Sequence, residues 1–306
     1  MKIVSLLPSA TEIVYALGLG DSLAARTHEC DHPAAVSEKP VITQSILPAG
    51  LSSGEIDAAV REQLNSSHSL YTINRDLLTA IRPDVILTQQ LCDVCAVSYN
   101  DVLAAVRSLP APGPCIVNLE PTTLEAVWDT ITRVGMATER EHEACEVTTA
   151  LRARVEAVRE RAAQAETRPR TVLLEWLDPL FCGGHWDPEL VQIAGGFDAL
   201  GRMHAPSTQI SCDAVLEFAP EVLVIAQCGF GIERTLEDLP KLLATPGFRE
   251  LPAVKAGRVF VVNGSDYFSR PGPRLADSLE MLASLVHPNL FGEMQDDFQR
   301  VIRCSL

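Results

Sequence analysis

Two stretches of the sequence decide the fold: residues 76–90 read DLLTAIRPDVILTQQ, and residues 213–227 read DAVLEFAPEVLVIAQ. The second stretch aligns with the first at a constant offset of 137 positions (213 − 76 = 137). In both, a helical pattern runs into a proline, and an acidic residue, an apolar run and a glutamine follow. A helix and a strand joined in the same way in both halves of the chain predict two similar α/β lobes.

Short apolar runs alternate with helical patterns on both sides of these stretches. The first half has predicted strands at residues 2–7, 22–27, 40–43, 84–88 and 115–119, with helices at 53–65, 75–81 and 99–109. The second half has predicted strands at 171–176, 222–226 and 258–262, with helices at 187–194 and 273–287. Such alternation is typical of mostly parallel sheets with helices on both faces. The first helix opens in the segment PSATE, where Ser9 is the predicted N-cap and Glu12 completes a capping box.

A long helix is predicted between the two halves. Residues 139–164 contain neither proline nor glycine, and about 26 residues at about 1.5 Å each give a helix of about 40 Å. Glutamates lie near its start and arginines near its end, which is the arrangement that the helix dipole favours. A solvated surface helix is the alternative, but the α/β alternation that resumes beyond it favours a rigid connection. We predict an N-terminal lobe at 1–138, a linking helix at 139–166 and a C-terminal lobe at 167–306.

The composition disfavours several classes of protein. The 306 residues carry a formal net charge of −15 (25 basic minus 40 acidic side chains), which disfavours binding to nucleic acids. No run approaches the roughly 18 apolar residues that a membrane-spanning helix needs. The apolar run at 3–7 is too short for a secretory signal, so a native start at Met1 predicts a cytoplasmic protein, and a removed leader predicts a periplasmic or other extracytoplasmic one. The nine cysteines cannot all pair within one chain.

Cysteine and histidine gather after two predicted strands of the first half. The segment HECDHP begins at His28, and the segment CDVC runs from Cys92 to Cys95. Thiolate and imidazole are ligands for zinc, copper or iron, and a lone Cys-x-x-Cys is either a redox pair or half of a zinc site. His28, Cys30, Cys92 and Cys95 are therefore candidate metal ligands. The alternative is that these side chains only cap and shape two loops.

Aromatic residues are rare, but tryptophan is concentrated in the second half. Two of the three tryptophans, Trp176 and Trp186, lie within eleven residues of sequence that follows a predicted strand, and His185 precedes Trp186. A tryptophan in a glycine-rich surface loop more often lines a ligand site than fills a core. We expect His185 to form a hydrogen bond, with metal binding as the alternative.

A stiff, proline-rich segment connects the last predicted strand to the last helix. Residues 263–274 read NGSDYFSRPGPR and hold two aromatic and two arginine side chains. Such a segment fits a preorganised binding edge, where rings stack on a ligand and charged side chains form hydrogen bonds to it. The alternative places Phe268 in the core and leaves Arg274 to cap a loop.

The order of these segments resembles that of the cobalamin-binding proteins of bacterial ABC importers, within the wider group that binds iron-siderophores, haem and vitamin B12. The resemblance rests on residues 3–12 (IVSLLPSATE), 30–33 (CDHP), 78–88, the long helix, 183–196, 265–270 (SDYFSR) and 273–274 (PR). It implies two Rossmann-like lobes joined by one long helix, with a corrinoid held in the cleft between them. It also implies a binding protein without catalytic activity, which agrees with the absence of an enzyme motif in its required context.

The resemblance also assigns residues to the ligand. The residues implied to contact the corrinoid are Glu29, Cys92, Asp93, Cys95, Trp176, His185, Trp186, Asp266, Tyr267, Phe268 and Arg270. The last four match the motif that edges the ring, and the three before them lie in the segment that faces it. Glu29 falls where relatives carry a loop residue that reaches the ligand. An ABC permease is the implied partner, with Glu233 or Glu237 as its contact on the second lobe.

The Cys-x-x-Cys pair and the absence of a lipobox depart from the importer pattern, and they keep two alternatives open. One is a cytoplasmic protein that holds a corrinoid without a permease. The other is a metal- or haem-handling protein, or an enzyme, that uses Cys30, Cys92, Cys95 and His28.

Overall fold

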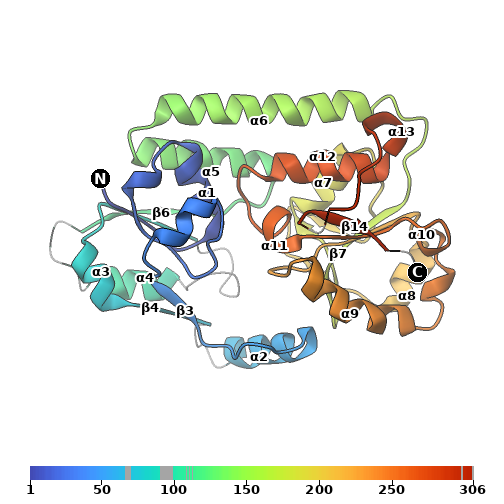
Figure 1. Cartoon of the computed structure of the whole chain (residues 1–306), viewed down its shortest axis with the longest axis horizontal. Coiled ribbons are helices and arrows are strands. Elements are labelled where there is room, and N and C mark those ends of the chain that lie inside the picture. The colour runs from blue at the N-terminus through green and yellow to red at the C-terminus, as the bar shows by residue number, and fades with distance from the viewer. Residues whose placement is uncertain are drawn as a thin grey trace. The chain divides into compact units, whose positions relative to one another are not determined.

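The computed structural model describes residues 1–65, 70–89, 99–107, 109, 111, 113–297 and 299–304 (Figure 1). The chain forms two compact units. Unit 1 comprises Met1–Pro121 and Glu125–Ala150, and unit 2 comprises Thr122–Leu124 and Leu151–Leu306. Each unit has its own sheet and its own apolar core.

Unit 1 is built on a four-stranded parallel sheet with the order β2-β1-β5-β6. The strands are β1 (Ile3–Ser5), β2 (Leu23–Ala25), β5 (Val85–Thr88) and β6 (Cys115–Asn118). A separate antiparallel hairpin pairs β3 (Thr43–Ser45) with β4 (Tyr71–Ile73). The helices of the unit include α1 (Pro8–Ala16), α2 (Ser53–Asn65), α3 (Arg75–Ile81), α4 (Tyr99–Val106) and, beyond its first residue, α5 (Leu124–Ala137). Helix α2 therefore separates the two strands of the hairpin along the chain.

The first helix begins earlier than the capping-box pattern predicts. Leu7 is its N-cap, and Pro8 occupies a first-turn position, where the missing N–H of proline is not needed and its fixed φ suits the helix. Ser9 and Glu12 lie inside the helix and are buried, so the predicted capping box is wrong. Polar side chains of the helix face the interior of the unit. Thr11 Oγ1, for example, donates a hydrogen bond of 2.8 Å to Ser5 Oγ at the end of β1.

Unit 2 is built on a six-stranded sheet with the order β11-β8-β7-β12-β13-β14. The strands are β7 (Thr171–Leu177), β8 (Leu180–Cys182), β11 (Thr208–Gln209), β12 (Val222–Ile225), β13 (Val259–Val262) and β14 (Val301–Arg303). The central strands β7, β12 and β13 are parallel, as the sequence predicts, whereas β8, β11 and β14 add antiparallel pairings toward the edges. In Figure 1, α7 (Asp187–Ile193) and α12 (Leu275–Val286) lie on one side of this sheet, and α8 (Cys212–Phe218) and α9 (Ile232–Ala244) lie on the other.

Short elements complete unit 2. They are the parallel pair β9 (Gly184–His185) and β10 (Arg202–Met203), and the helices α10 (Pro252–Lys255), α11 (Gly264–Tyr267) and α13 (Pro288–Phe291). The core of the unit lies around β7, β12 and β13, and every residue of β12 is fully buried. Each buried aliphatic side chain of this kind stabilises the fold by about 1.5–3 kcal/mol. The apolar runs found in the sequence are thus the central strands.

The repeated sequence unit forms the same structure in both halves. In unit 1, the Asn74 side chain caps α3, and Arg82 ends the helix in the left-handed region at φ 52°. In unit 2, the Ser211 side chain caps α8, and Ala219 ends it at φ 50°. A proline follows each left-handed residue, and a buried parallel strand, β5 or β12, comes next. The structure therefore confirms the internal repeat.

The long helix α6 (Glu141–Ala162) has 22 residues and is slightly shorter than predicted. The division between the units falls inside it, after Ala150. Within unit 2, the Arg154 guanidinium lies 2.5 Å from Asp277 and 2.8 Å from Glu280 of α12. The hydrogen bond from Arg154 to Glu280, followed by that to Asp277, raises the pKa of the arginine. None of the helices in the described part of the chain combines the length and the apolar composition that crossing a membrane requires.

Candidate functional site

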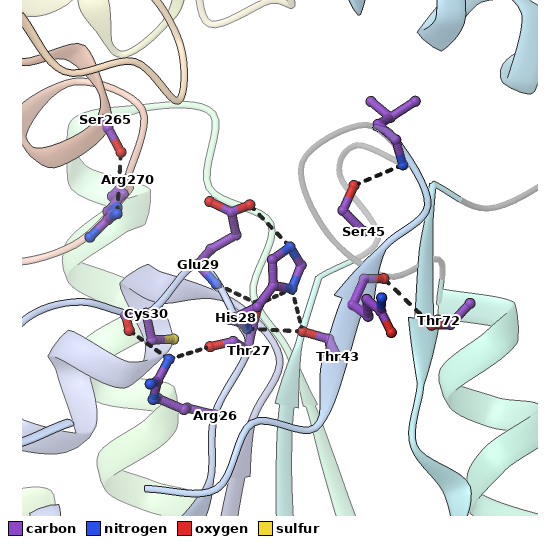
Figure 2. A network of polar contacts seen from close by, with 12 residues as sticks. Arg26, Thr27, His28, Glu29, Cys30, Thr43, Ser45, Thr72, Ser265 and Arg270 are labelled. Atoms are coloured by element: carbon purple, nitrogen blue, oxygen red, sulfur yellow. Dashed lines mark hydrogen bonds and ion pairs between the residues drawn. The ribbon is translucent and has the colours of Figure 1, made fainter. Parts of the chain in front are cut away.

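The loop that follows β2 in unit 1 holds His28 and Glu29 in a fixed arrangement (Figure 2). The Thr43 hydroxyl of β3 accepts a hydrogen bond of 3.1 Å from His28 N and lies 2.8 Å from His28 Nδ1. The other ring nitrogen, Nε2, lies 3.1 Å from the Glu29 carboxylate, whose side chain is 46 % exposed. Glu29 N donates to Thr27 Oγ1 at 3.2 Å. His28 is therefore anchored to Thr43 through Nδ1, while Nε2 lies at ion-pair distance from Glu29 without a hydrogen bond to any described residue. The Glu29 carboxylate is one of the groups that this loop presents to solvent.

Cys30 lies in the interior of unit 1. The residue is 3 % exposed, and its sulfur lies 3.0 Å from Thr11 Oγ1, which donates to Ser5 Oγ. Its carbonyl oxygen accepts a hydrogen bond of 2.9 Å from Arg26 (Figure 2). The thiol thus ends a buried chain of hydroxyl groups that joins β1, α1 and the loop after β2. The thiol is thus shielded from solvent and faces a hydroxyl group.

The predicted metal site is only partly contained in the described residues. Within them, no group of three or more cysteine, histidine, aspartate or glutamate side chains is arranged to hold a metal ion. Cys92, Asp93 and Cys95 lie outside the described residues. The metal set that combines Cys92 and Cys95 with His28 and Cys30 therefore stays a prediction.

In unit 2, Trp176 belongs to a stack of flat side chains near the carboxyl end of β7. Its ring centre lies 5.0 Å from that of Phe230, at an interplanar angle of 43°, and its indole N–H donates to the Asp178 carbonyl at 3.0 Å. The guanidinium carbon of Arg234 on α9 lies 4.5 Å from the centre of the Phe230 ring. Trp176, Phe230 and Arg234 form what we call the aromatic stack. It offers partly exposed aromatic surface with a cation beside it.

Phe230 and Arg234 were not predicted as site residues from the sequence. One signal was available, because Phe230 lies just beyond the carboxyl end of β12, and parallel α/β sheets bind ligands at that end of their strands. Arg234 gave no such signal, since it is one of several charged residues on the amphipathic helix α9.

Trp186 is a core residue of unit 2. It is 6 % exposed, and its indole N–H donates at 2.9 Å to the carbonyl of Phe268, which is 2 % exposed. The His185 ring stacks against Trp186 with 5.5 Å between ring centres. Burial lowers the pKa of His185, so the imidazole is neutral at neutral pH. Trp186 and Phe268 are therefore buried in unit 2, whereas Trp176 and His185 are partly exposed.

The turn after β13 brings Asp266 and Arg270 together. The Asn263 side chain accepts from Asp266 N and donates to Asp266 Oδ2, both at 3.0 Å. Arg270 is 6 % exposed, donates to Ser265 Oγ at 3.2 Å (Figure 2) and lies 4.0 Å from the Asp266 carboxylate. Both residues are thus held in place by their own turn before any ligand arrives.

Two further arginines flank Tyr267 in the same region. The guanidinium carbons of Arg274 and Arg300 each lie 5.5 Å from the centre of the Tyr267 ring, and Arg274 lies 3.8 Å from the Asp266 carboxylate. We call Asp266, Tyr267, Arg270, Arg274 and Arg300 the basic edge. It holds three arginines against one aspartate in a chain that is acidic overall. Such an edge can accept an anionic group or the carbonyl oxygens of a ligand.

Three carboxyl side chains of low exposure, those of Glu175, Asp187 and Asp198, lie close enough to interact electrostatically. Glu175 Oε2 accepts a hydrogen bond of 3.1 Å from Gly184 N, and burial raises the pKa of Glu175. Asp187 is 5 % exposed. Its burial, and then the charge of Glu175, raise the pKa of Asp187 well above its usual range. Burial also raises the pKa of Asp198, whose Oδ1 accepts from two backbone amides. Glu175 and Asp198 thus bind backbone amides of neighbouring loops, whereas Asp187 Oδ1 has no hydrogen-bond partner in the described part of the chain. These acids were missed because the sequence does not reveal their low exposure.

A comparison with known families identifies the kind of protein. Residues 3–265 match the family described as periplasmic binding protein. The chain belongs to this family. Periplasmic binding proteins of this group are substrate-binding proteins and not enzymes, so the stack and the basic edge belong to a solute-binding protein without catalytic activity.

Three proteins illustrate what this chain is similar to. The vitamin B12-binding protein of Vibrio cholerae serotype O1 is 26 % identical over 284 residues, which cover 92 % of this chain and 88 % of that protein. An uncharacterized ABC transporter substrate-binding lipoprotein of Bacillus subtilis is 23 % identical over 305 residues, which cover 95 % and 82 %. The crystal structure of a periplasmic heme binding protein from Pseudomonas aeruginosa superimposes with a TM-score of 0.71 at 19 % identity, over 94 % of this chain and 93 % of that one. This likeness confirms the predicted fold class.

Proposed function

We propose that this periplasmic binding protein binds cobalamin or a related corrinoid as the substrate-binding component of an ABC importer. The observation that carries the proposal is the basic edge, where Asp266 and Arg270 are fixed beside Tyr267. A corrinoid is a broad ring fringed with amide side chains, and it needs flat apolar surfaces together with donors and acceptors at its rim. The similarity to a vitamin B12-binding protein over 92 % of the chain supports the same ligand.

Each group has a role in this proposal. Trp176 and Phe230 of the aromatic stack pack against the ring, where each buried aromatic surface contributes to affinity. Arg270 donates to amide oxygens of the rim, and Asp266 accepts from amide N–H groups. Glu29 accepts from a further amide of the ligand. Cys92, Asp93 and Cys95 belong to the same proposed contact set.

The proposal includes an ABC permease as partner and an extracytoplasmic location. The similarity to an ABC transporter substrate-binding lipoprotein supports both. Glu233 and Glu237 are exposed on α9 and are the proposed permease contacts on unit 2. Glu237 already lies 3.3 Å from Arg234, so Glu233 is the better candidate for a contact with a cationic partner.

Haem is the second candidate, and one observation favours it. Arg274 and Arg300 flank Tyr267 as a pair of cations, which is the arrangement that two propionate carboxylates require. The neutral imidazole of His185 is a suitable ligand for haem iron. A metal-handling protein based on Cys30, Cys92, Cys95 and His28 is a weaker alternative, because Cys30 is buried.

A retention experiment with the full chain separates these candidates. The purified protein is incubated with cyanocobalamin or with haemin, passed through a desalting column, and examined by visible absorption and by metal analysis. We expect stoichiometric retention of cyanocobalamin and no stable haem spectrum. Retention of haem alone, or of zinc or iron with neither chromophore, would overturn the corrinoid proposal.

A further inference from the structure

Unit 1 contains a cavity outside the contacts assigned above. It has a volume of about 500 Å³ and lies against the β3–β4 hairpin, next to residues of α2, α3 and α4. Its apolar wall is formed by Ile46 and Ile73, and Gln63, Tyr71 and Arg75 are among its polar lining residues. We call it the side pocket. Its volume lies within the roughly 300–1,000 Å³ that small-molecule sites occupy.

The lining of the side pocket combines three kinds of chemistry. Ile46, Ile73 and the ring of Tyr71 offer surface for a flat apolar group. Arg75 supplies a guanidinium, and among the described residues no ion-pair partner neutralises it. Gln63 and Asp101 add an amide and a carboxylate that can bind hydroxyl groups. A heterocyclic base joined through a sugar to a phosphate requires this combination, whereas a purely apolar ligand does not.

The side pocket is adjacent to the loop that presents Glu29. The Tyr71 ring lies 5.6 Å from the His28 ring, at an interplanar angle of 43°. His28 in turn contacts Thr43 of β3 and Glu29. The hairpin register pairs Thr43 with Ile73 and Ser45 with Tyr71, so both sites are built on the same two short strands. A ligand whose rim reaches Glu29 can therefore place an appendage beside Tyr71.

We propose that the side pocket binds the nucleotide tail of a complete corrinoid, with the base against Tyr71 and the phosphodiester at Arg75. The inference rests on the proposed function, because it assigns a part of the same ligand to unit 1. It makes the β3–α2–β4 segment a specificity element that distinguishes complete corrinoids from incomplete ones that lack the tail.

The test compares two ligands that differ in the tail. Isothermal titration of the full chain measures the Kd for cyanocobalamin, which has the nucleotide, and for dicyanocobinamide, which lacks it. The variants are Arg75→Gln and Tyr71→Leu, and the matched control is Arg82→Gln, an exposed arginine at the other end of α3. We expect Arg75→Gln to weaken cyanocobalamin about tenfold, through loss of one charge-assisted contact, and to leave dicyanocobinamide unchanged. Tyr71→Leu is expected to act in the same direction, and Arg82→Gln to change neither Kd.

Thermal unfolding of each variant shows whether it is folded, and Arg75→Gln, which leaves the Tyr71 ring in place, carries the test alone if Tyr71→Leu does not fold. Equal losses for both ligands, or no loss for either, would overturn the side-pocket inference while the proposed function stands. Arg75-dependent binding of free adenosine monophosphate, with equal Kd for the two corrinoids, would overturn it in favour of a separate nucleotide site. A wild-type chain that binds neither corrinoid would overturn the proposed function itself.

Discussion

The guanidinium of Arg234 lies 4.5 Å from the centre of the Phe230 ring. Phe230 in turn packs against Trp176 at 5.0 Å, so one ring connects a cation on α9 to a tryptophan on β7. The contact fixes the side chains of Trp176 and Phe230 against each other, although more than fifty positions separate them in the sequence. A flat surface that is already ordered loses little entropy when a ring packs on it.

Phe230→Ala tests whether this surface contacts the ligand. We expect the Kd for cyanocobalamin to rise about tenfold, because removal of a buried aromatic contact from a binding site costs more than 1 kcal/mol. The matched control is Phe197→Ala, which removes another partly exposed phenylalanine that is itself tilted by 43° against Phe218. The control should change the Kd less than twofold. Equal effects of the two substitutions in isothermal titration would contradict a role of the aromatic stack in binding.

The buried carboxyl of Asp187 predicts a pH dependence of stability. Burial, followed by the charge of Glu175, raises the pKa of Asp187 well above its usual range. Between the unfolded pKa of about 4 and the higher folded pKa, the folded chain holds a proton that the unfolded chain has released. This contribution to the free energy of unfolding is therefore complete below the unfolded pKa and is lost as pH rises toward the folded pKa. Glu175 shifts in the same direction.

Asp187→Asn removes the ionisable group and keeps its size. We expect the free energy of unfolding of the variant to exceed that of the wild type by on the order of 1 kcal/mol near neutral pH. The difference should be smaller near pH 5, and urea unfolding at the two pH values measures it. Asp213→Asn, at an exposed position on α8, is the control and should alter neither value. A loss of stability that is the same at both pH values would contradict the prediction, because it would mean that hydrogen-bond geometry outweighs the cost of the charge.

The repeated unit and the central strands were predictable because their signals are local. A capping side chain at Asn74 or Ser211, a left-handed residue before proline and an apolar run all lie within about fifteen residues of sequence. The antiparallel strands toward the edges of the unit 2 sheet were not predictable in this way. Strand β14 has three residues and forms because Val301 and its neighbours pair with β13, about forty positions earlier in the chain.

In the candidate site, too, local contacts could be predicted from the sequence and long-range contacts could not. Asp266 and Arg270 are four positions apart, and one turn brings them together. Trp186 looks like a ligand contact in the sequence, yet its N–H donates to the carbonyl of Phe268, 82 positions away, and this pairing places it in the core. Long-range partners of this kind decide burial, and the local pattern does not contain them.

Arg154 is expected to stabilise the attachment of α6 to α12 within unit 2. Its guanidinium binds both Asp277 and Glu280, and a network of this kind is stronger than a single exposed ion pair. We expect Arg154→Ala to lower the free energy of unfolding by about 1 kcal/mol, and less at high salt because all three groups are partly exposed. Arg159→Ala breaks one exposed pair with Glu156 on the same helix and should cost no more than about 0.5 kcal/mol. If the two substitutions lower the free energy of unfolding equally, or if salt does not change the loss for Arg154→Ala, the contribution of Arg154 comes from packing of its aliphatic stem and not from its charge.

Cys30 provides a direct test of the buried hydroxyl chain. Its sulfur lies 3.0 Å from Thr11 Oγ1, and the residue is 3 % exposed, so we expect the thiol to resist alkylation by iodoacetamide in the folded protein. Cys115 and Cys145 are exposed and free, and they serve as internal controls that should be modified rapidly, as peptide mass spectrometry will report. Cys30→Ala should lower the free energy of unfolding by about 1–2 kcal/mol, because it leaves a small cavity and removes a partner of Thr11. Rapid alkylation of Cys30 at the rate of Cys145 would show that the thiol reaches solvent, and it would support Cys30 as a metal ligand.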